Sequence, residues 1–174
     1  MGMQTDVLAG HIDVSGFIVP NGRYRVKQIT YQASGAGAGT VEVFDTTSAP
    51  VSATYGRTGA LVTITKNAHG LATGDSIGVG FSAAAGASAT DGNYVITKVD
   101  ANSFTITDSN SGTVTPGTAC RYVDGDGGRW LVSFSTLTSQ TATVPVIIPG
   151  EGILAATGIY VSLTNTAFVT VFYG

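Results

Sequence analysis

Very few residues in this sequence could perform chemistry by themselves. The chain has two histidines, His11 and His69, and one cysteine, Cys120. A catalytic or metal-binding imidazole needs a second histidine, a cysteine or paired carboxylates nearby, and neither histidine has them in sequence. The single cysteine excludes an intramolecular disulfide and a cysteine-based zinc site. We therefore expect His69 to be a turn or core residue, and Cys120 to be a free thiol on a strand.

His69 opens the turn-forming sequence AHGLATGDS. Gly70 permits a positive φ, Leu71 can fill one end of a small apolar core, and the imidazole can bond backbone carbonyls. Gly74 and Asp75 follow as a tight turn in which the carboxylate can accept from nearby N–H groups. These five residues are predicted to form a structural turn and not a catalytic site.

The acidic sequence DGDGG supplies the strongest candidate for metal binding. Asp124 and Asp126 alternate with glycines and could offer oxygen ligands to Ca²⁺. The EF-hand pattern requires a further acidic residue late in the loop, whereas Arg129, Trp130 and Leu131 begin an expected strand. We expect a flexible turn here, with calcium binding as the alternative and no cofactor.

Recognisable catalytic motifs are absent from the sequence. It contains no nucleophile elbow, Walker loop, dinucleotide fingerprint or spaced pair of carboxylates. The glycines from Gly35 to Gly39 are not followed by Lys-Ser/Thr or by a helix, so they make a poor phosphate cradle. We expect a protein that is not an enzyme.

Composition limits the partners and favours strands. Only 11% of the residues are charged and the formal net charge is -3, which disfavours nucleic acid as a partner. The 24 glycines, with abundant Thr, Ser and Val and few Glu or Lys, predict an all-β chain. The apolar runs are shorter than the roughly 20 residues of a membrane span, and the first residues do not resemble a signal peptide. We expect no membrane partner and a cytoplasmic origin.

The strand-like runs between residues 60 and 108 differ in sequence character from those before and after them, which suggests two domains. Four runs between Ala60 and Asp108 could close on themselves, and we expect residues 55–123 to be a small β-barrel or β-roll. This module is inserted into a jelly-roll-like β-sandwich made of residues 1–54 and 124–174, in which residues 1–10 form an N-terminal arm. Residues 47–59 are expected to be a linker.

Two segments of the expected insert look like loops. Ser82 to Gly92 is rich in Ala, Ser and Gly, so we expect it to be exposed and mobile. Ser109 to Gly117 is expected to be a second polar loop.

Two early strands are indicated by alternation. His11 to Val19 has Ile12, Val14, Phe17 and Val19 as buried candidates. The stretch from Arg23 to Ala33 places Arg23, Arg25 and Lys27 on the face opposite to its apolar residues, which makes it the most basic face of the chain. We expect a solvated face, with a specific anion or carboxylate partner as the alternative.

The sequence AHGLATGDSIGVGF, followed by DGNYVITKVDANSFTIT, resembles a β-module of bacteriophage virion proteins. In that module an H-G-L-x-x-G-D turn precedes a strand and then G-x-Y-x-V-x-x-V-D-x-x-x-F-x-I. The C-terminal GIYVSLTNTAFVTVFYG is similar to the closing strand pair of small phage structural proteins. The matching residues are His69, Gly70, Leu71, Gly74, Asp75, Gly92, Tyr94, Val99, Asp100 and Phe104.

The resemblance implies a structural part of a virion that is assembled in the host cytoplasm. A capsid decoration or cement protein is the first expectation, and the alternatives are a small tail or neck protein or a receptor- or glycan-binding tip. The expected partners are other copies in a homo-oligomer and other virion proteins, such as the major capsid protein or tail proteins. Expected core or interface residues are Trp130, Phe168, Phe172 and Tyr173.

Overall fold

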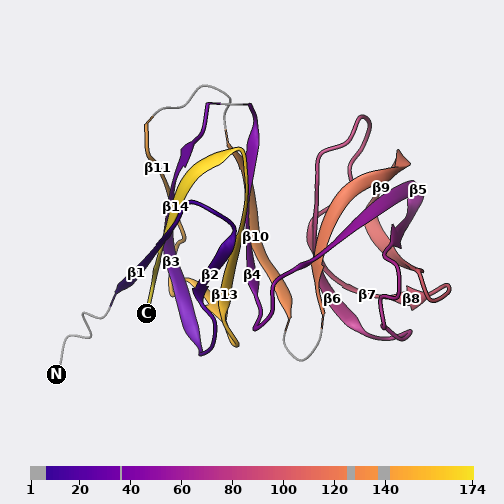
Figure 1. Ribbon diagram of the computed structural model, residues 1–174, viewed down its shortest axis with the longest axis horizontal. Helices are drawn as coiled ribbons and strands as arrows, with labels where there is room; N and C mark the ends of the chain where they lie inside the picture. The colour runs from indigo at the N-terminus through magenta and orange to yellow at the C-terminus, as the bar shows by residue number, and fades with distance from the viewer. Residues whose placement is uncertain (1–6, 36, 125–127, 137–141) are drawn as a thin grey trace. The chain divides into compact units, whose positions relative to one another are not determined.

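The computed structural model describes residues 7–35, 37–124, 128–136 and 142–174. Its regular structure in these ranges consists of fourteen β-strands without any helix, which confirms the all-β class (Figure 1). The chain separates into two compact units. The first unit comprises Met1–Ala49 and Leu131–Gly174, and the second comprises Pro50–Trp130. The second unit thus begins before Tyr55 and ends after Val123.

The first unit contains two antiparallel sheets. Strand order in the larger sheet is β1-β14-β3-β11, with β12 also paired to β3, and the order in the smaller sheet is β10-β4-β13-β2. The larger sheet is built from β1 (Leu8–Ile12), β3 (Tyr24–Ala33), β11 (Val144–Ile147), β12 (Ile153–Ala155) and β14 (Thr166–Tyr173). The smaller sheet is built from β2 (Gly16–Val19), β4 (Gly39–Asp45), β10 (Arg129–Thr136) and β13 (Ile159–Thr164).

The two sheets of the first unit enclose one apolar core, as expected of a β-sandwich. β-Branched residues dominate this core because they suit a pleated, half-buried surface. Its fully buried members include Val26, Ile29, Val169 and Val171 from the larger sheet and Val41, Val43, Ile159 and Val161 from the smaller sheet.

Not every expected core residue is buried in the first unit. Ile12, Phe17 and Val19 are half-buried, but Val14 is 69% exposed. Val14 lies between β1 and β2, outside both strands, so the alternation that predicted its burial does not continue through it.

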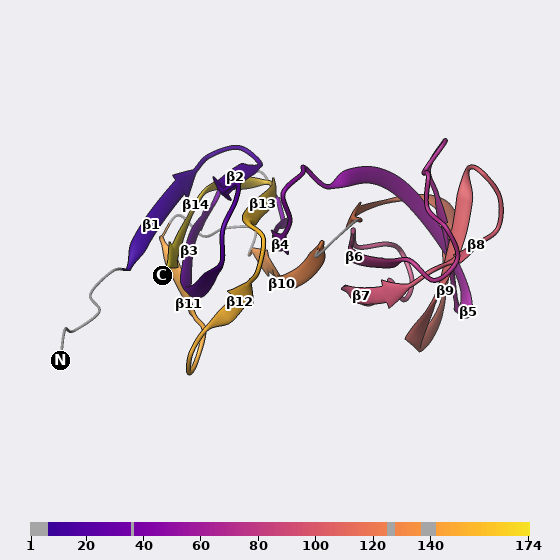
Figure 2. The same ribbon diagram turned by 90° about the horizontal axis from the view of Figure 1, so that it is seen from below.

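The second unit is one curled sheet with the order β5-β9-β6-β7, in which β8 also pairs with β9. This order leaves β5 and β7 at its ends, so the sheet is open: of the two expected forms, the closed barrel is not formed, and the β-roll agrees with an open sheet. Figure 2 shows the strong curl of β5 and β9. The strands are β5 (Val51–Thr65), β6 (Ser76–Phe81), β7 (Gly92–Val95), β8 (Thr97–Lys98) and β9 (Ser103–Val123).

Two segments expected as a linker and a loop are strands. Residues 51–59 of the expected linker and 109–117 of the expected loop belong to the strands of the long β5–β9 ladder, where Val51 faces Tyr122 and Thr58 faces Thr113. The ladder shifts register between Tyr55 and Arg57 and again between Gly59 and Leu61. The glycines that suggested irregular structure are located at these bulges, where Gly59 has a φ of 66°.

A second apolar core lies inside the curled sheet. It contains Val62 and Ile64 of β5, Ile77 and Val79 of β6, and Phe104 of β9, all at most 1% exposed. These residues recur at every second position along their strands, as half-buried strands require. Alternation of apolar residues in the sequence therefore predicts the core strands of both units. It does not predict the glycine-rich part of the β5–β9 ladder.

Candidate functional site

His69 holds the turn between β5 and β6 with both ring nitrogens. Its Nδ1 accepts a hydrogen bond from the Leu71 amide at 3.1 Å, so Nε2 carries the proton and donates to the Asp100 carbonyl at 2.9 Å. The ring packs edge-on against Phe104, with 5.1 Å between the centroids. The side chain is 8% exposed. A neutral imidazole with both nitrogens bonded is a structural group and not a free base.

The rest of the turn is organised by glycine conformation and by Asp75. Gly70 and Gly74 have φ of 76° and 98°, a region that other residues rarely adopt. The Asp75 carboxylate accepts from the Ala72 amide at 2.8 Å, and Leu71 is buried in the core of the second unit. The side chains thus occupy the places that the sequence analysis expects of them.

The two parts of the phage-like sequence meet in space. His69 reaches Asp100 and Phe104 as described above, and the Asp100 carboxylate accepts from the Asn102 amide at 2.7 Å. This bond, together with others from Ser103, lowers the pKa of Asp100. The Gly74 amide donates to the Ile96 carbonyl at 3.0 Å. The two sequence stretches therefore form one hydrogen-bonded corner at the end of the β8–β9 hairpin.

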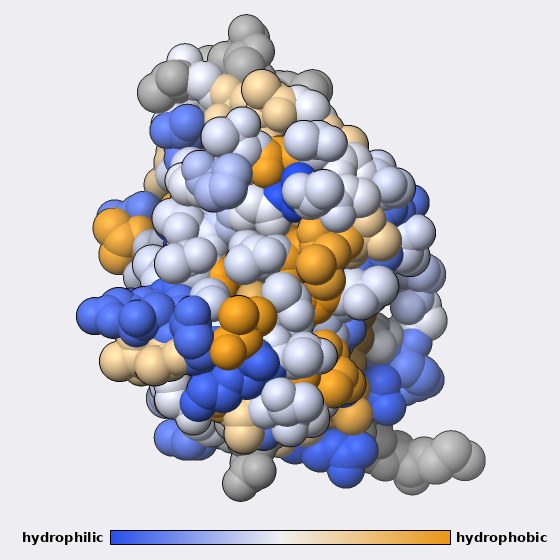
Figure 3. Space-filling view, turned by 90° about the vertical axis from the view of Figure 1, so that its right-hand side faces the viewer, coloured by the Kyte–Doolittle hydropathy of each residue, from blue (hydrophilic) through white to orange (hydrophobic). Residues whose placement is uncertain are grey.

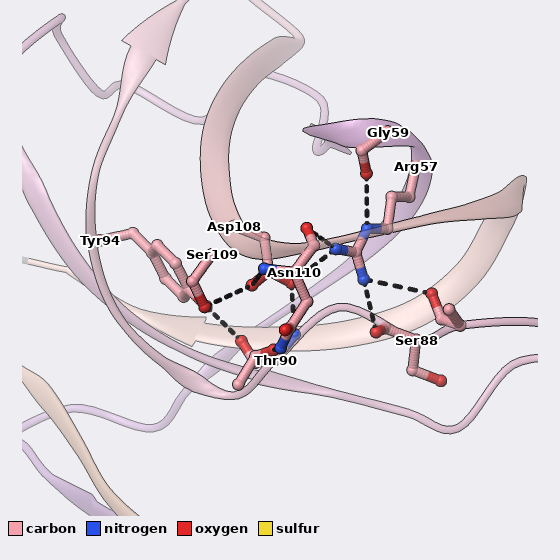
Figure 4. A network of polar contacts seen from close by, with 9 residues as sticks. Arg57, Gly59, Ser88, Thr90, Tyr94, Asp108, Ser109 and Asn110 are labelled. Atoms are coloured by element: carbon pink, nitrogen blue, oxygen red, sulfur yellow. Dashed lines mark hydrogen bonds and ion pairs between the residues drawn. The ribbon is translucent and has the colours of Figure 1, made fainter.

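A buried ion pair that the sequence analysis did not identify lies in the second unit (Figure 4). Arg57 Nη2 lies 3.2 Å from Asp108 Oδ2, and both side chains are 0% exposed. The same guanidinium donates to the carbonyls of Gly59, Ser88 and Asn110, at 2.9 Å and 2.7 Å for the first two. Arg57 thus spreads its donors over three different segments of the unit.

Asp108 is the anionic half of this network. Its carboxylate accepts from the Thr90 amide at 2.8 Å and from the Asn110 amide at 3.1 Å. Burial alone would raise the pKa of Asp108, but these bonds and Arg57 outweigh it and lower the pKa. Burial and the nearby carboxylates, with Asp108 first among them, raise the pKa of Tyr94 to about 12. Tyr94 donates its hydroxyl proton to the Thr90 carbonyl.

The segment 82–91 is bonded to this network at some positions, whereas Ala83, Ala85, Gly86, Ala87 and Thr90 are exposed as expected, and its mobility stays a prediction. Besides Ser88, the Ala87 carbonyl accepts from Arg57 Nη1 at 3.3 Å, and the Asp91 carboxylate accepts from the Phe81 amide at 2.7 Å. Ala89 is 6% exposed and belongs to the core. Small residues allow this segment to lie flat against the core and leave its carbonyls within reach of Arg57.

A second buried carboxylate, Asp45, is located in the first unit. It accepts from the backbone amides of Ala156, Thr157 and Gly158 at 2.8, 2.8 and 3.2 Å, and from the Thr157 hydroxyl at 2.7 Å. Asp45 is the last residue of β4 and is 0% exposed. It caps the turn that leads into β13. Its place at the end of an expected strand gave no signal of this role.

The structure describes only part of the acidic DGDGG stretch. Asp126 lies outside the described residues, and Asp124 is half-buried directly after β9. Within the described ranges no group of three or more His, Cys, Asp or Glu side chains could hold a metal ion. Calcium binding by this stretch stays a prediction.

The expected interface residues are separated. Trp130 belongs to the second unit, where its amide and carbonyl bond the Asn93 side chain at 2.9 and 3.1 Å. Phe168, Phe172 and Tyr173 lie on β14 of the first unit and are half-buried. Tyr173 packs edge-on against Tyr24, so it belongs to the sandwich interior.

The other singled-out side chains have structural surroundings. His11 is exposed on β1, where Nδ1 lies 2.9 Å from the Thr170 hydroxyl and the ring tilts against Phe168. Cys120 lies on β9, forms no disulfide among the described residues and is 2% exposed.

The basic strand face borders a cleft of about 490 Å³ in the first unit. Arg23, Arg25 and Lys27 all line it. The Lys27 ammonium donates to the Glu151 carbonyl at 2.8 Å, and Arg25 reaches the Gly152 carbonyl at 3.5 Å. Two of the three cations are therefore bonded to one turn, and an anionic partner stays a prediction.

Comparisons with known proteins identify no family. No family model and no curated protein matches the chain. One similar solved structure is that of the phage phi92 endosialidase, with 18% identity and a TM-score of 0.29 over 81% of this chain and 20% of that chain. The match thus spans a small part of that protein. The described residues form no helix that is long and apolar enough to cross a membrane.

Proposed function

We propose that this protein is a non-enzymatic structural component of a bacteriophage virion, with the first unit as its assembly domain. The observation that carries the proposal is the outward face of the larger sheet. Directly paired residues on antiparallel strands point to the same side. Val169 pairs with Tyr31 and Val171 with Ile29, and all four are buried, so the residues between them on β14 and β3 point outward.

Part of this outward surface is poor in charge, and we call this part the assembly face; the cations Arg25 and Lys27 lie beyond it, on the end of β3 that is next to β12. Its strands contribute aromatic, aliphatic and uncharged polar side chains, and His11 is the single ionisable member among its described residues. Depletion of charge with aromatic enrichment marks the centre of protein interfaces. The assembly face consists of Ala9, His11, Gln28, Thr30, Gln32, Pro145, Ile147, Phe168, Thr170 and Phe172.

The exposure of this face supports contact with a partner. Ile147 is 74% exposed, and Phe168 and Phe172 are half-buried. Large apolar side chains on this charge-poor part of the sheet lose contact with water when a second surface covers them, which favours association. Copies of the chain and neighbouring virion proteins are the proposed partners.

The polar side chains support a structural role over catalysis. His69 uses both nitrogens within a turn, Asp108 is paired with Arg57, and Asp45 caps a turn. Each of these groups holds backbone segments in place. The sequence resemblance of His69 to Phe104 to a phage virion module supports the same proposal.

Within the virion, we propose decoration of the head as the location. The alternatives are a small tail or neck protein and a receptor- or glycan-binding tip. A glycan-binding tip usually presents aromatic rings to the sugar, whereas the strongly exposed large apolar residues described here are Val, Leu and Ile. The tail and the head differ only in the neighbours that the assembly face would meet.

Antibody labelling of purified phage particles tests this proposal. We expect an antibody raised against the chain to label many sites on each head in electron micrographs, and particles that lack the gene to remain unlabelled. Label confined to the tail would support the tail alternative. Absence of the protein from purified particles would overturn the proposal.

A further inference from the structure

The β5 strand has a long unpaired edge. In the described part of the second unit, β5 forms one end of the sheet and pairs only with β9. It is 15 residues long. Alternate residues of an antiparallel strand direct their N–H and C=O groups away from the paired neighbour, so this edge offers a row of donors and acceptors to another strand.

The last five residues of β5 have none of the features that protect natural sheet edges. Leu61 to Thr65 contains neither charge nor proline, and both register shifts of β5 come before Leu61. Two other strands are better guarded: β8 is two residues long and includes Lys98, and β11 contains Pro145. Strand edges without such protection pair readily with other strands.

The exposed side of this segment is suited to contact. Leu61 is 50% exposed, and Thr63 and Thr65 are also exposed, whereas Val62 and Ile64 point into the core. Figure 3 looks onto the second unit and shows apolar patches between residues of intermediate hydropathy and strongly hydrophilic ones. A cleft of about 290 Å³ follows the same strand, lined by Gly56, Arg57, Thr58, Leu61, Thr63, Thr65, Val114 and Pro116.

We propose that this edge binds the same edge of a second copy of the chain, paired antiparallel about Thr63. The two-fold axis would place Thr63 of one copy opposite Thr63 of the other, and Leu61 opposite Thr65. Threonine pairs and apolar–threonine pairs favour a sheet, and the absence of charge removes like-charge repulsion at the axis. Such an isologous contact joins the two curled sheets into one.

This inference is independent of the proposed function. It concerns the second unit, whereas the assembly face belongs to the first unit. A dimer through β5 could form in a protein that is absent from virions, and a virion protein could lack it.

Cysteine cross-linking of the full chain tests the pairing at residue level. Antiparallel partners lie about 4.5–5.5 Å apart between Cα atoms, within the range that a disulfide spans. Native Cys120 is 2% exposed, so an introduced cysteine is the accessible thiol. We expect Thr63→Cys to form a dimer of doubled mass under mild oxidation that reductant reverses, and Thr65→Cys and Thr97→Cys to remain monomeric.

The controls separate edge pairing from random collision. Thr97 is an exposed threonine on β8, on the other side of the sheet from β5. Equal cross-linking at positions 63 and 97, or none at 63, would overturn the proposal, and a maximum at position 65 would overturn the stated register. In the Phe172→Asp background, in which contact through the assembly face is removed, Thr63→Lys should abolish dimers in sedimentation experiments, and dimers that persist in this double variant would also overturn the proposal. Phe172→Asp, on the assembly face, should leave the Thr63→Cys cross-link unchanged.

Discussion

The first unit buries its core between two sheets, whereas the second unit buries its core inside one curled sheet. In the first unit, each sheet covers the other, and Asp45 fixes a single turn by accepting from three backbone amides. In the second unit, part of the cover is the segment 82–91, which has no sheet behind it. The Arg57–Asp108 pair attaches that segment to the sheet, because Arg57 donates to the Ser88 carbonyl and Asp108 accepts from the Thr90 amide.

The difference shows what a small open sheet requires. Carbonyls of a covering segment need donors when it lies on an apolar core, since a buried unpaired polar group is destabilising. One guanidinium can supply several donors, and its charge then requires a buried anion. The second unit should therefore depend on a single ionic network, and the first unit on apolar contact with one cap.

The largest expected effect is that of removing the cation from the second unit. Arg57→Met leaves Asp108 buried without its partner and should lower the free energy of unfolding of this unit by about 3–5 kcal/mol. Urea unfolding, monitored by the fluorescence of Trp130, the only tryptophan, measures this change in the free energy of unfolding. Adding Asp108→Leu should restore part of the loss. An effect as small as that of the exposed control Lys98→Met would contradict the role of the pair.

The equivalent change in the first unit removes its carboxylate cap. Asp45→Ala leaves three amides without their acceptor and should destabilise the first unit by about 2–3 kcal/mol, since each buried unpaired donor costs about 1–3 kcal/mol and some regain water. Hydrogen exchange should show faster exchange at residues 156–158 and no change in the second unit. Asp13→Ala, at an exposed position, is the matched control. Equal loosening of both units would show that they are not independent.

Close packing of the second unit at Gly78 provides a third test. A Cβ at Gly78 would lie 2.1 Å from the Trp130 nitrogen, whereas one at Gly92 would meet nothing closer than 3.5 Å. Gly78→Ala should therefore cost about 1–3 kcal/mol through overpacking, and Gly92→Ala less. Thermal unfolding of the two variants compares them. Similar melting temperatures would contradict the close approach of these backbones.

Acid should weaken the second unit specifically. The pKa of Asp108 is lower in the folded protein than its usual value of about 3.9, so its contribution to stability is complete above that value and is lost as the pH falls through the folded pKa. The difference in unfolding free energy between the wild type and Asp108→Asn should shrink below about pH 4. A constant difference from pH 7 to pH 3 would contradict the assignment.

The smallest expected effect concerns the His69 turn. Gly70 has a φ of 76° with open space around it, so Gly70→Ala introduces backbone strain without a clash, at a cost of about 1–2 kcal/mol. Gly70→Asn should cost less, because asparagine tolerates this conformation. Chemical unfolding of the Gly70→Ala and Gly70→Asn variants measures the two losses of stability. Equal stability of the alanine variant and the wild type would contradict the strain at this position.

The sequence predicted those features that depend on local pattern. Composition gave the all-β class, alternation gave strands such as residues 24–33, and the run from His69 to Asp75 indicated a turn whose imidazole bonds a carbonyl. These features involve residues close in sequence or strict periodicity. They can be seen without knowledge of the fold.

Long-range pairing was not predictable in the same way. Residues 51–59 and 112–122 have glycines and polar residues in place of alternation, and they become strands because they pair with each other. Arg57 and Asp108 are far apart in the chain, and either alone looks like a solvated surface charge. Only the β5–β9 ladder brings them together, and the bonds of Arg57 and Asp108 to residues 87–90 could not be foreseen for the same reason.

High-resolution electron cryomicroscopy of intact phage particles tests the central claim most directly. We predict density for the sandwich of the first unit at many symmetry-related positions on the head, with Phe168, Phe172 and Ile147 of the assembly face buried against a neighbouring subunit. Particles carrying Phe172→Asp should lose this density. Particles in which the chain is absent, or is present with the assembly face open to solvent, would contradict the account.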